Sequence, residues 1–239
     1  MTDNISDYYN FTHPHNAVGP GVFKHRLGNF QTPGGGQMQG APTVGVLHVP
    51  VADFYNGGAD QTAEIVAKYL SAPPENYEPH KHGGFIRTGC THATSDRDSF
   101  VLCLPMDSVA WGCGNPNTGA RSWEIEIAGW GKDTAEYWRG PDARLKLIQA
   151  ARAHIAAAKL VGGDEWKKWV IPAQKAVLNS YGVCLTPGWT QHREIPYWNG
   201  YKWAQPPTDN LMAGQHYDIC ENFPYDVWFE VLNGEVNAA

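Results

Sequence analysis

The sequence predicts a single α/β domain in which helices flank a central mixed β-sheet. Segments typical of strands and of helices alternate along the chain, and a strand–helix–strand order comes early. Residues 121–130 alternate apolar and polar side chains, as a half-buried strand does. The 239 residues fit one large domain, and a hydrophobic content of 42% is enough to form a core.

The first 43 residues differ in composition from the rest of the chain. They are rich in Gly, Pro, Asn and His, include the stretch QTPGGGQMQGAP, and show no helical periodicity. We therefore predict an N-terminal arm or extension over residues 1–43 and one folded domain over residues 44–239.

The first predicted strand is VGVLHV, a short apolar run with β-branched residues between Pro42 and Pro50. His48 lies near its end. A buried imidazole needs a hydrogen-bond partner or a metal. His48 is therefore a candidate ligand or catalytic residue, and a hydrogen-bonded core histidine is the alternative.

The middle of the chain predicts one helix and then further strands. The segment DQTAEIVAKYLSAPP is typical of a helix, with Asp60 as a possible N-cap and two prolines as its stop. HGGFIRTG and the run beginning SFVLCLP are strand-like, and CTHATSDRD between them is a polar loop. Within residues 121–130, alternation places Glu124 and Glu126 on the face opposite to Trp123 and Ile125.

The C-terminal half predicts helices around one more strand. Residues 142–160 form the clearest helix, and a structural role is expected for His154 within it. Residues 165–182 look helical, with a break at Pro172. TPGWTQHREIP is a short strand or turn that carries His192, and an aromatic loop follows. The segment YDVWFEVLNG is predicted to close the chain as a helix that ends at Gly234.

Composition and charge exclude several classes of protein. A net charge of −6 argues against a nucleic-acid partner. A charged content of only 18%, together with 10 Trp and 11 Tyr, favours binding of an uncharged or mixed polymer. The sequence shows neither a membrane span nor a signal peptide at MTDNISDYYN, and its 5 cysteines include no CxxC pair. We expect synthesis in a cytosol, where the cysteines are reduced.

Three separate segments carry side chains that suit one metal site. His48 ends a strand, His192 follows PGWTQ, and Asp218 or Cys220 lies in HYDICENFPYD. Two imidazoles and one anionic ligand fit a catalytic zinc site with an open position for water. Glu126 lies on a strand that could supply a carboxylate to accept a proton. The local motif HExxH is absent, and the alternative is a domain with some buried histidines and surface carboxylates.

Five segments, in order, resemble the type-2 N-acetylmuramoyl-L-alanine amidases, a superfamily that includes phage endolysins and is related to peptidoglycan recognition proteins. They are VGVLHVP, KHGGFI, SVAWGCGNPNTGARSWEIEIAGW, HREI and DICENFPYD. The resemblance covers roughly residues 43 to 232. It implies the amidase-like version of the α/β fold, so that residues 44–239 form a zinc amidase catalytic domain.

The resemblance also implies roles for individual residues. His48 and His192 match the two imidazole ligands of Zn²⁺, and Asp218 matches the carboxylate ligand. Cys220 is the alternative third ligand, because some phage members use a cysteine at that spacing. Glu126 matches the glutamate that acts as general base.

Other positions match less closely. Glu124 replaces a small residue of the family, and we expect it to be a carboxylate at the rim of the site. His216 stands where many members have a lysine that stabilises the oxyanion. Gly112 stands where the family has a histidine. The residues expected to contact substrate are His82, Trp111, Asn115 and Trp198.

The activity implied is hydrolysis of the amide bond between N-acetylmuramic acid and L-alanine. The partner would be bacterial peptidoglycan, both glycan strand and stem peptide, and the protein would be a monomer with no membrane insertion. The resemblance further implies a phage endolysin, made in the host cytoplasm and reaching the wall after the membrane is breached. The alternatives are an inactive peptidoglycan-binding module and another zinc peptidase of the cell wall.

Overall fold

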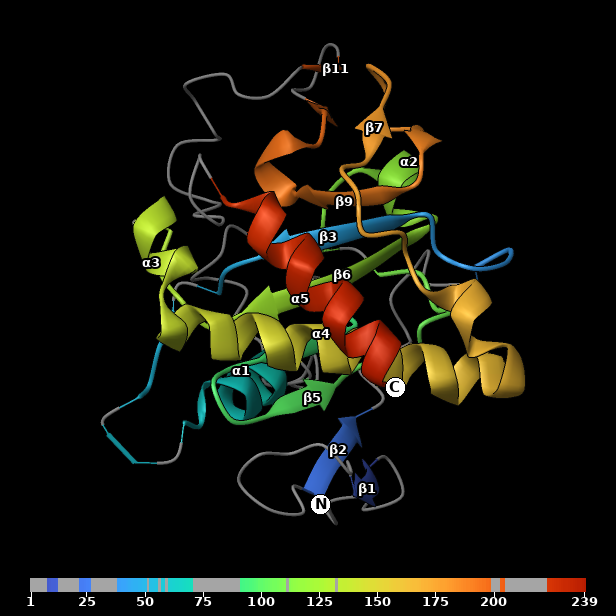
Figure 1. Cartoon of the computed structure of the whole chain (residues 1–239). Helices are drawn as coiled ribbons and strands as arrows, with labels where there is room; N and C mark the ends of the chain where they lie inside the picture. Colours follow the sequence, from blue (N-terminus) through green and yellow to red (C-terminus); the bar gives the residue numbers. More distant parts are fainter. Residues whose placement is uncertain are drawn as a thin grey trace, which may run out of the picture.

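A mixed β-sheet forms the centre of the molecule (Figure 1). The computed structural model describes residues 8–12, 22–26, 38–50, 52–55, 57–58, 60–70, 91–110, 112–131, 133–198, 203–204 and 223–239. Within this part of the chain, the sheet has seven strands in the order β1-β2-β5-β4-β6-β3-β9. The strands are β1 (Tyr8–Thr12), β2 (Val22–Arg26), β3 (Val44–His48), β4 (Ala93–Ser95), β5 (Phe100–Leu102), β6 (Ser122–Ile127) and β9 (Gly188–Gln191).

The strands β4, β6, β3 and β9 run parallel to one another, and β5 is antiparallel to β4. The hairpin of β1 and β2 extends the sheet next to β5, so part of the predicted N-terminal arm belongs to the sheet. Two small two-stranded sheets lie apart from it. They are formed by β7 (Val177–Leu178) with β8 (Cys184–Thr186), and by β10 (Tyr197–Trp198) with β11 (Trp203–Ala204).

Helices cover both faces of the sheet. The alternation of β5 shows this, because Phe100 and Leu102 join the cluster that contains α4 and α5, whereas Val101 packs with Ala63 and Ala67 of α1. The long helices are α1 (Thr62–Leu70), α4 (Pro141–Gly162) and α5 (Tyr225–Ala238). The shorter ones are α2 (Pro116–Gly119), α3 (Ala135–Arg139) and the 3₁₀ segments Gly163–Trp169 and His192–Glu194.

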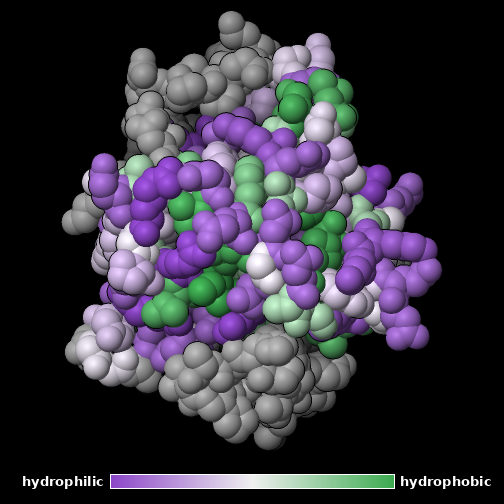
Figure 2. Space-filling model, in the orientation of Figure 1, coloured by the Kyte–Doolittle hydropathy of each residue, from purple (hydrophilic) through white to green (hydrophobic). Residues whose placement is uncertain are grey.

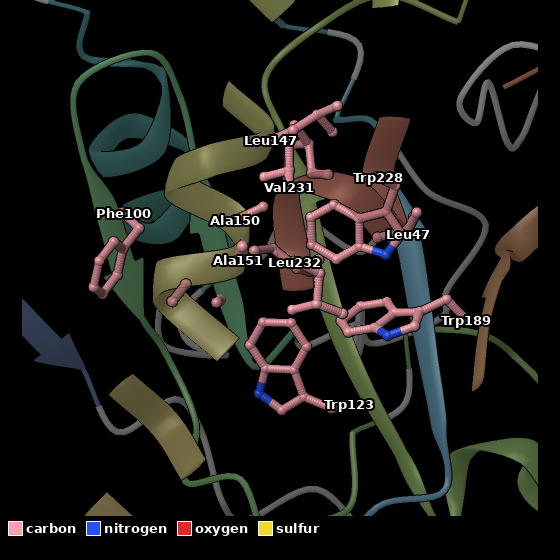
Figure 3. Packing of buried hydrophobic residues seen from close by; sticks show 14 of the residues in the cluster. Leu47, Phe100, Trp123, Leu147, Ala150, Ala151, Trp189, Trp228, Val231 and Leu232 are labelled. Carbon is pink, nitrogen blue, oxygen red and sulfur yellow. The ribbon is translucent and has the colours of Figure 1, made fainter. Parts of the chain in front are cut away.

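The main core lies between the sheet and the pair α4 and α5. Trp123, Trp189 and Trp228 are fully buried there, and their rings meet edge to face, with centroids 6.0 Å apart for the first pair and 4.7 Å for the second (Figure 3). His154 of α4 packs between Trp123 and Trp189, at 4.6 and 5.0 Å. Each large side chain buried in this way contributes roughly 1.5–3 kcal/mol, so this face holds much of the folding free energy.

The surface seen in Figure 2 is mainly hydrophilic where α4 and α5 cover the sheet. Apolar side chains are exposed on the β7–β8 hairpin, where Val177, Val183 and Leu185 are 49%, 43% and 64% exposed. Among the described residues, no helix is both long and apolar enough to cross a bilayer.

The predicted fold class is confirmed, and so are the helices near residues 62–70 and 141–162. Two predictions of local structure were wrong, and the end of the last helix was misplaced. The polar stretch 90–98 contains β4, whose Thr94 hydroxyl donates to the carbonyl of Ala63 at 2.7 Å and so is satisfied inside the protein. Residues 165–182 are helical only as far as Trp169, and the chain then turns into β7. The last helix continues past Gly234 to Ala238. The predicted strand HGGFIRTG lies outside the described residues.

Candidate metal and catalytic site

The candidate site lies where three parallel strands end. His48 is the last residue of β3, His192 directly follows β9, and Glu126 is one residue from the end of β6. The carboxyl ends of parallel strands meet at one edge of a sheet, which is where ligands bind in open α/β sheets. Sequence-distant residues therefore come together because the strands that carry them are neighbours in the order β6-β3-β9.

The site occupies the face of the sheet opposite to α4 and α5. Leu47 and Trp189 point into the core beneath those helices. Val46 packs on the other side, with Cys113 and Ile195. Because side chains alternate along a strand, His48 shares the face of Val46.

The two histidines are in direct contact. The ring centroids of His48 and His192 lie 4.9 Å apart, and the rings meet edge to face. His48 is only 4% exposed. His192 is partly exposed as a residue, but protein surrounds its ring. Desolvation, followed by the nearby His48, lowers the pKa of His192 to about 3, against the opposing effects of Glu124 and of a hydrogen bond to the Cys113 backbone. His192 is therefore neutral at physiological pH, as a metal ligand must be.

Glu124 lies beneath the histidines. Its side chain is fully buried, Ser122 Oγ donates to its Oε1 at 2.7 Å, and its Oε2 is 3.6 Å from Nε2 of His48. Burial alone would raise the pKa of this carboxyl. The contacts with His48 and Ser122 outweigh that effect and lower the pKa. The expectation of a rim carboxylate was thus wrong, because the strand face that carries Glu124 is covered by protein.

Glu126 lies next to His48 and nearer to the surface. The two residues are partners in the parallel register of β3 and β6, so their side chains leave the sheet on the same face. Glu126 is partly exposed, in contrast to Glu124 two residues earlier. A partly exposed carboxylate at the strand ends, beside His48, can accept a proton from a water molecule there.

The donor chemistry of this cluster fits a zinc site. Neutral imidazoles are common zinc ligands, and a catalytic site takes three protein ligands and one water. Within the described residues, no group of three His, Cys, Asp or Glu side chains could hold a metal ion. The third ligand was predicted at Asp218 or Cys220, and both lie outside those residues. Of the three predicted ligands, His48 and His192 thus lie among the described residues, and their rings are in contact.

Asn115 has an evident structural function. It is buried, and its Oδ1 accepts hydrogen bonds from the backbone amides of Asn117 and Thr118 at the start of α2. Its Nδ2 donates to the carbonyls of Tyr181 and Pro196, at 3.2 and 2.6 Å. These bonds hold the β7–β8 turn and the segment after His192 against α2. Contact of Asn115 with substrate remains a prediction.

The other residues predicted to act in the site lie outside the described part of the chain. His82, Trp111 and His216 belong to segments whose placement is not described, and of Trp198 only the backbone is described, in β10. Their roles remain predictions.

The turn that carries His192 is held by Glu194, which the sequence analysis did not single out. Glu194 Oε2 accepts hydrogen bonds from the hydroxyls of Thr190 and Tyr225, at 2.9 and 2.7 Å, and Oε1 accepts one from Lys175 at 2.9 Å. Tyr225 is the first residue of α5. Gln191 and Glu194 also form a capping box around the turn. An S/T/N/Q-x-x-E pattern around His192 is the signal that could have revealed this arrangement.

Comparison with known proteins gives only distant likenesses. No protein-family model and no curated protein matches the chain. Among solved structures, the PlyG catalytic domain is 16% identical, with 68% of this chain and 71% of that chain covered and a TM-score of 0.40. The Staphylococcus aureus hydrolase AmiA in complex with its ligand is 18% identical, with 81% and 72% covered and a TM-score of 0.42. A selenomethionine AmpD derivative is 16% identical, with 80% and 85% covered and a TM-score of 0.42.

Proposed function

We propose that this protein is a zinc-dependent N-acetylmuramoyl-L-alanine amidase that acts on bacterial peptidoglycan. The observation that carries the proposal is the contact between His48 and His192, with ring centroids 4.9 Å apart, beside Glu126 at the ends of β3, β9 and β6. These three residues come from segments far apart in the sequence. They are also the residues that the resemblance to type-2 amidases assigned to two zinc ligands and a general base.

In this proposal His48, His192 and Asp218 hold the zinc ion, with Cys220 as the alternative third ligand. Zinc in such a site polarises the substrate carbonyl and lowers the pKa of water to about 7. Glu126 accepts the proton from the attacking water and delivers it to the nitrogen of the leaving L-alanine. His216 donates a hydrogen bond to the oxyanion. The glycan strand and stem peptide are contacted by His82, Trp111, Asn115 and Trp198. The protein acts as an endolysin that reaches the wall after the membrane is breached.

The first test measures zinc by mass spectrometry in protein purified without added metal. We expect about one zinc ion per chain in the wild type, as a catalytic site requires, and its loss in His192→Ala. His154→Gln is the matched control, because His154 is a buried histidine on the opposite face of the sheet and should leave zinc in place. Comparing Asp218→Ala with Cys220→Ala identifies the third ligand.

The second test follows the products from purified peptidoglycan. An amidase releases L-alanine amino termini and creates no new reducing sugar ends. Glu126→Gln should retain zinc and lose activity by about 10²–10⁴-fold, which is the usual contribution of a general base. A wild-type protein that takes up no zinc, or that cleaves between amino acids of the stem peptide, would refute the proposal.

A further inference from the structure

The carboxylate of Glu124 has no function in the reaction proposed above. It is fully buried, whereas the proton transfer is assigned to the partly exposed Glu126. The resembled family has a small residue at this position, so the resemblance does not supply a role either. Burying a carboxylate is costly unless donors surround it, and the position of Glu124 next to His48 therefore calls for a physical explanation.

The surroundings of Glu124 fix its position at two points. Ser122 Oγ donates to Oε1 at 2.7 Å, which orients the carboxylate. The backbone N–H of Glu124 donates to Nδ1 of His92 at 3.0 Å. Because Nδ1 of His92 is an acceptor, its Nε2 carries the proton and donates to the carbonyl of Ser108 at 2.8 Å. The backbone of β6 at Glu124 is thus held by the buried His92. The second carboxylate oxygen of Glu124, Oε2, is directed at His48.

We propose that Glu124 is a positioning residue that selects the tautomer of His48. Its Oε2 lies 3.6 Å from Nε2 of His48, a distance from which a hydrogen bond forms with a small shift when a metal binds, since such bonds are often long before binding. A proton held on Nε2 leaves the lone pair on Nδ1. His48 then presents Nδ1 to the zinc ion. This zinc contact rests on the proposed function, whereas the tautomer of His48 does not.

The geometry separates this role from direct ligation. Metal-bound histidines usually donate their other ring N–H to a carboxylate or a carbonyl, which fixes the ring and raises its basicity. His48, His192 and Glu124 do not form a metal-holding group of three among the described residues. Glu124 lies behind His48, in the position of such an outer carboxylate.

The test compares zinc affinity, measured on metal-free protein by competition with a chromophoric chelator. Glu124→Met removes the acceptor with little change in volume and should weaken zinc binding by about 10- to 100-fold, the range found for outer-shell partners. Glu124→Gln keeps a carbonyl oxygen and should recover part of that loss. Ser122→Ala, which removes only the hydrogen bond from the Ser122 hydroxyl to Oε1, should have a smaller effect in the same direction. Asp60→Asn is the matched control, because Asp60 is an equally buried carboxylate in a separate cluster. The zinc affinity of this variant should equal that of the wild type.

A second readout does not depend on zinc. Nitrogen-15 NMR of the metal-free protein should show His48 with its proton on Nε2 in the wild type, and a mixture of tautomers in Glu124→Met. A wild type with Nδ1 protonated would overturn the inference. So would a zinc affinity in Glu124→Met and Ser122→Ala within about twofold of the wild type, which lies below the usual outer-shell effect. Loss of zinc in Glu124→Gln as complete as in His48→Ala would instead make Glu124 a ligand. If the wild type binds no zinc, the proposed function fails, and the NMR result still decides the tautomer.

Discussion

Two clusters of polar side chains, both largely buried, differ in how their charges are compensated. In the first, the Arg97 guanidinium bonds to Asp142, to Asp60 at 2.8 Å and to Asp53 at 3.1 Å. Lys146, which is fully buried, donates to Asp53 at 2.7 Å. Three carboxylates thus meet two fixed cations, and charge-assisted bonds hold the loop before α1, the turn after β4 and helix α4 together.

In the second cluster, at the ends of β3, β6 and β9, the described residues place no Lys or Arg side chain against the Glu124 carboxylate. The groups that lower the pKa of Glu124 are His48, His92 and Ser122, and the neighbouring His192 stays neutral because its pKa is lowered to about 3. A divalent cation would supply the missing positive charge. The first cluster therefore stabilises the fold, and the charge balance of the second agrees with the metal site proposed above.

Arg97→Met gives the largest expected effect, and it concerns stability only. Removing the guanidinium leaves Asp53, Asp60 and Asp142 with Lys146 as their main cation, and breaking a buried ion network costs about 3–5 kcal/mol. Urea denaturation measures the loss, while zinc affinity of the folded protein should not change. Arg139→Met is the control, since Arg139 pairs with Asp226 on the surface and its loss should matter little. A stability loss no larger than that of the control would remove the basis of the comparison.

His154 is a buried histidine outside the site, and it should make the stability of the folded protein depend on acid pH. Burial, and then the nearby His92, lowers the pKa of His154 to about 3, so the folded protein keeps it neutral. In the unfolded chain its pKa is about 6.5. The unfolded state therefore binds the extra proton first, and this contribution to stability falls as the pH drops from about 6.5 towards 3.

The variant His154→Gln does not titrate, and its amide oxygen can still accept the N–H of Ile171, which His154 Nε2 accepts at 3.0 Å. Below about pH 6, the wild type should lose up to about 1.4 kcal/mol per pH unit more than the variant. Urea denaturation of the metal-free proteins at several pH values measures the difference. Parallel curves for the two proteins would show that His154 is not held neutral.

Gly45→Ala should affect both stability and metal binding, because Gly45 lies against Trp189 of β9, the strand that leads to His192. A Cβ at this position would overlap the ring of Trp189 in β9. Overpacking of a core costs about 1–3 kcal/mol. Since His192 follows Trp189 by three residues, displacement of β9 should also weaken zinc binding. Gly234→Ala is the matched control, because its Cβ would meet nothing within 4 Å in α5, and alanine there should stabilise the helix slightly. Unchanged stability and affinity in Gly45→Ala would mean that β9 adjusts freely.

Elements with a clear periodicity were predictable from the sequence. The alternation of β6 and the helical pattern of α4 identified both correctly, and the buried run VGVLHV identified β3. The strand β4 was missed because it is short and its polar Thr94 and Ser95 resemble a loop, although both are buried. Residues 173–182 carry helix-forming side chains, but the chain after Pro172 pairs with β9 and then forms a hairpin.

The candidate site was predictable only in part, because the sequence does not show which side chains of a strand are covered by other segments. His48 was singled out because a polar residue near the end of an apolar strand is unusual, and His192 because the segment HREI resembles the one that carries a histidine ligand in the amidases. The structure brings these two together. The sequence also placed Glu124 and Glu126 on one face of a strand. It does not show which part of that face is covered, and that depends on the Cys113 segment packed over it. The burial of Glu124 therefore emerges only in three dimensions.

Tyr225→Phe should have the smallest effect, because the turn that carries His192 is held by several contacts. The Tyr225 hydroxyl donates to Glu194 Oε2 at 2.7 Å, but Glu194 keeps its bonds from Thr190 and Lys175 in the variant. We expect a loss of about 1 kcal/mol in unfolding free energy. Zinc affinity should fall by a factor of about two to five, well below the effect of an outer-shell partner.

Urea denaturation and chelator competition measure these two quantities for Tyr225→Phe. Tyr181→Phe is the control, because Tyr181 is 56% exposed on the β7–β8 turn and should change neither quantity. A loss of zinc affinity in Tyr225→Phe as large as in Glu124→Met would show that the position of α5 governs the site. The site would then be coupled to the face of the sheet that α4 and α5 cover. The proposed separation between the Arg97 cluster, which stabilises the fold, and the cluster at the strand ends, which would bind a ligand, would no longer apply.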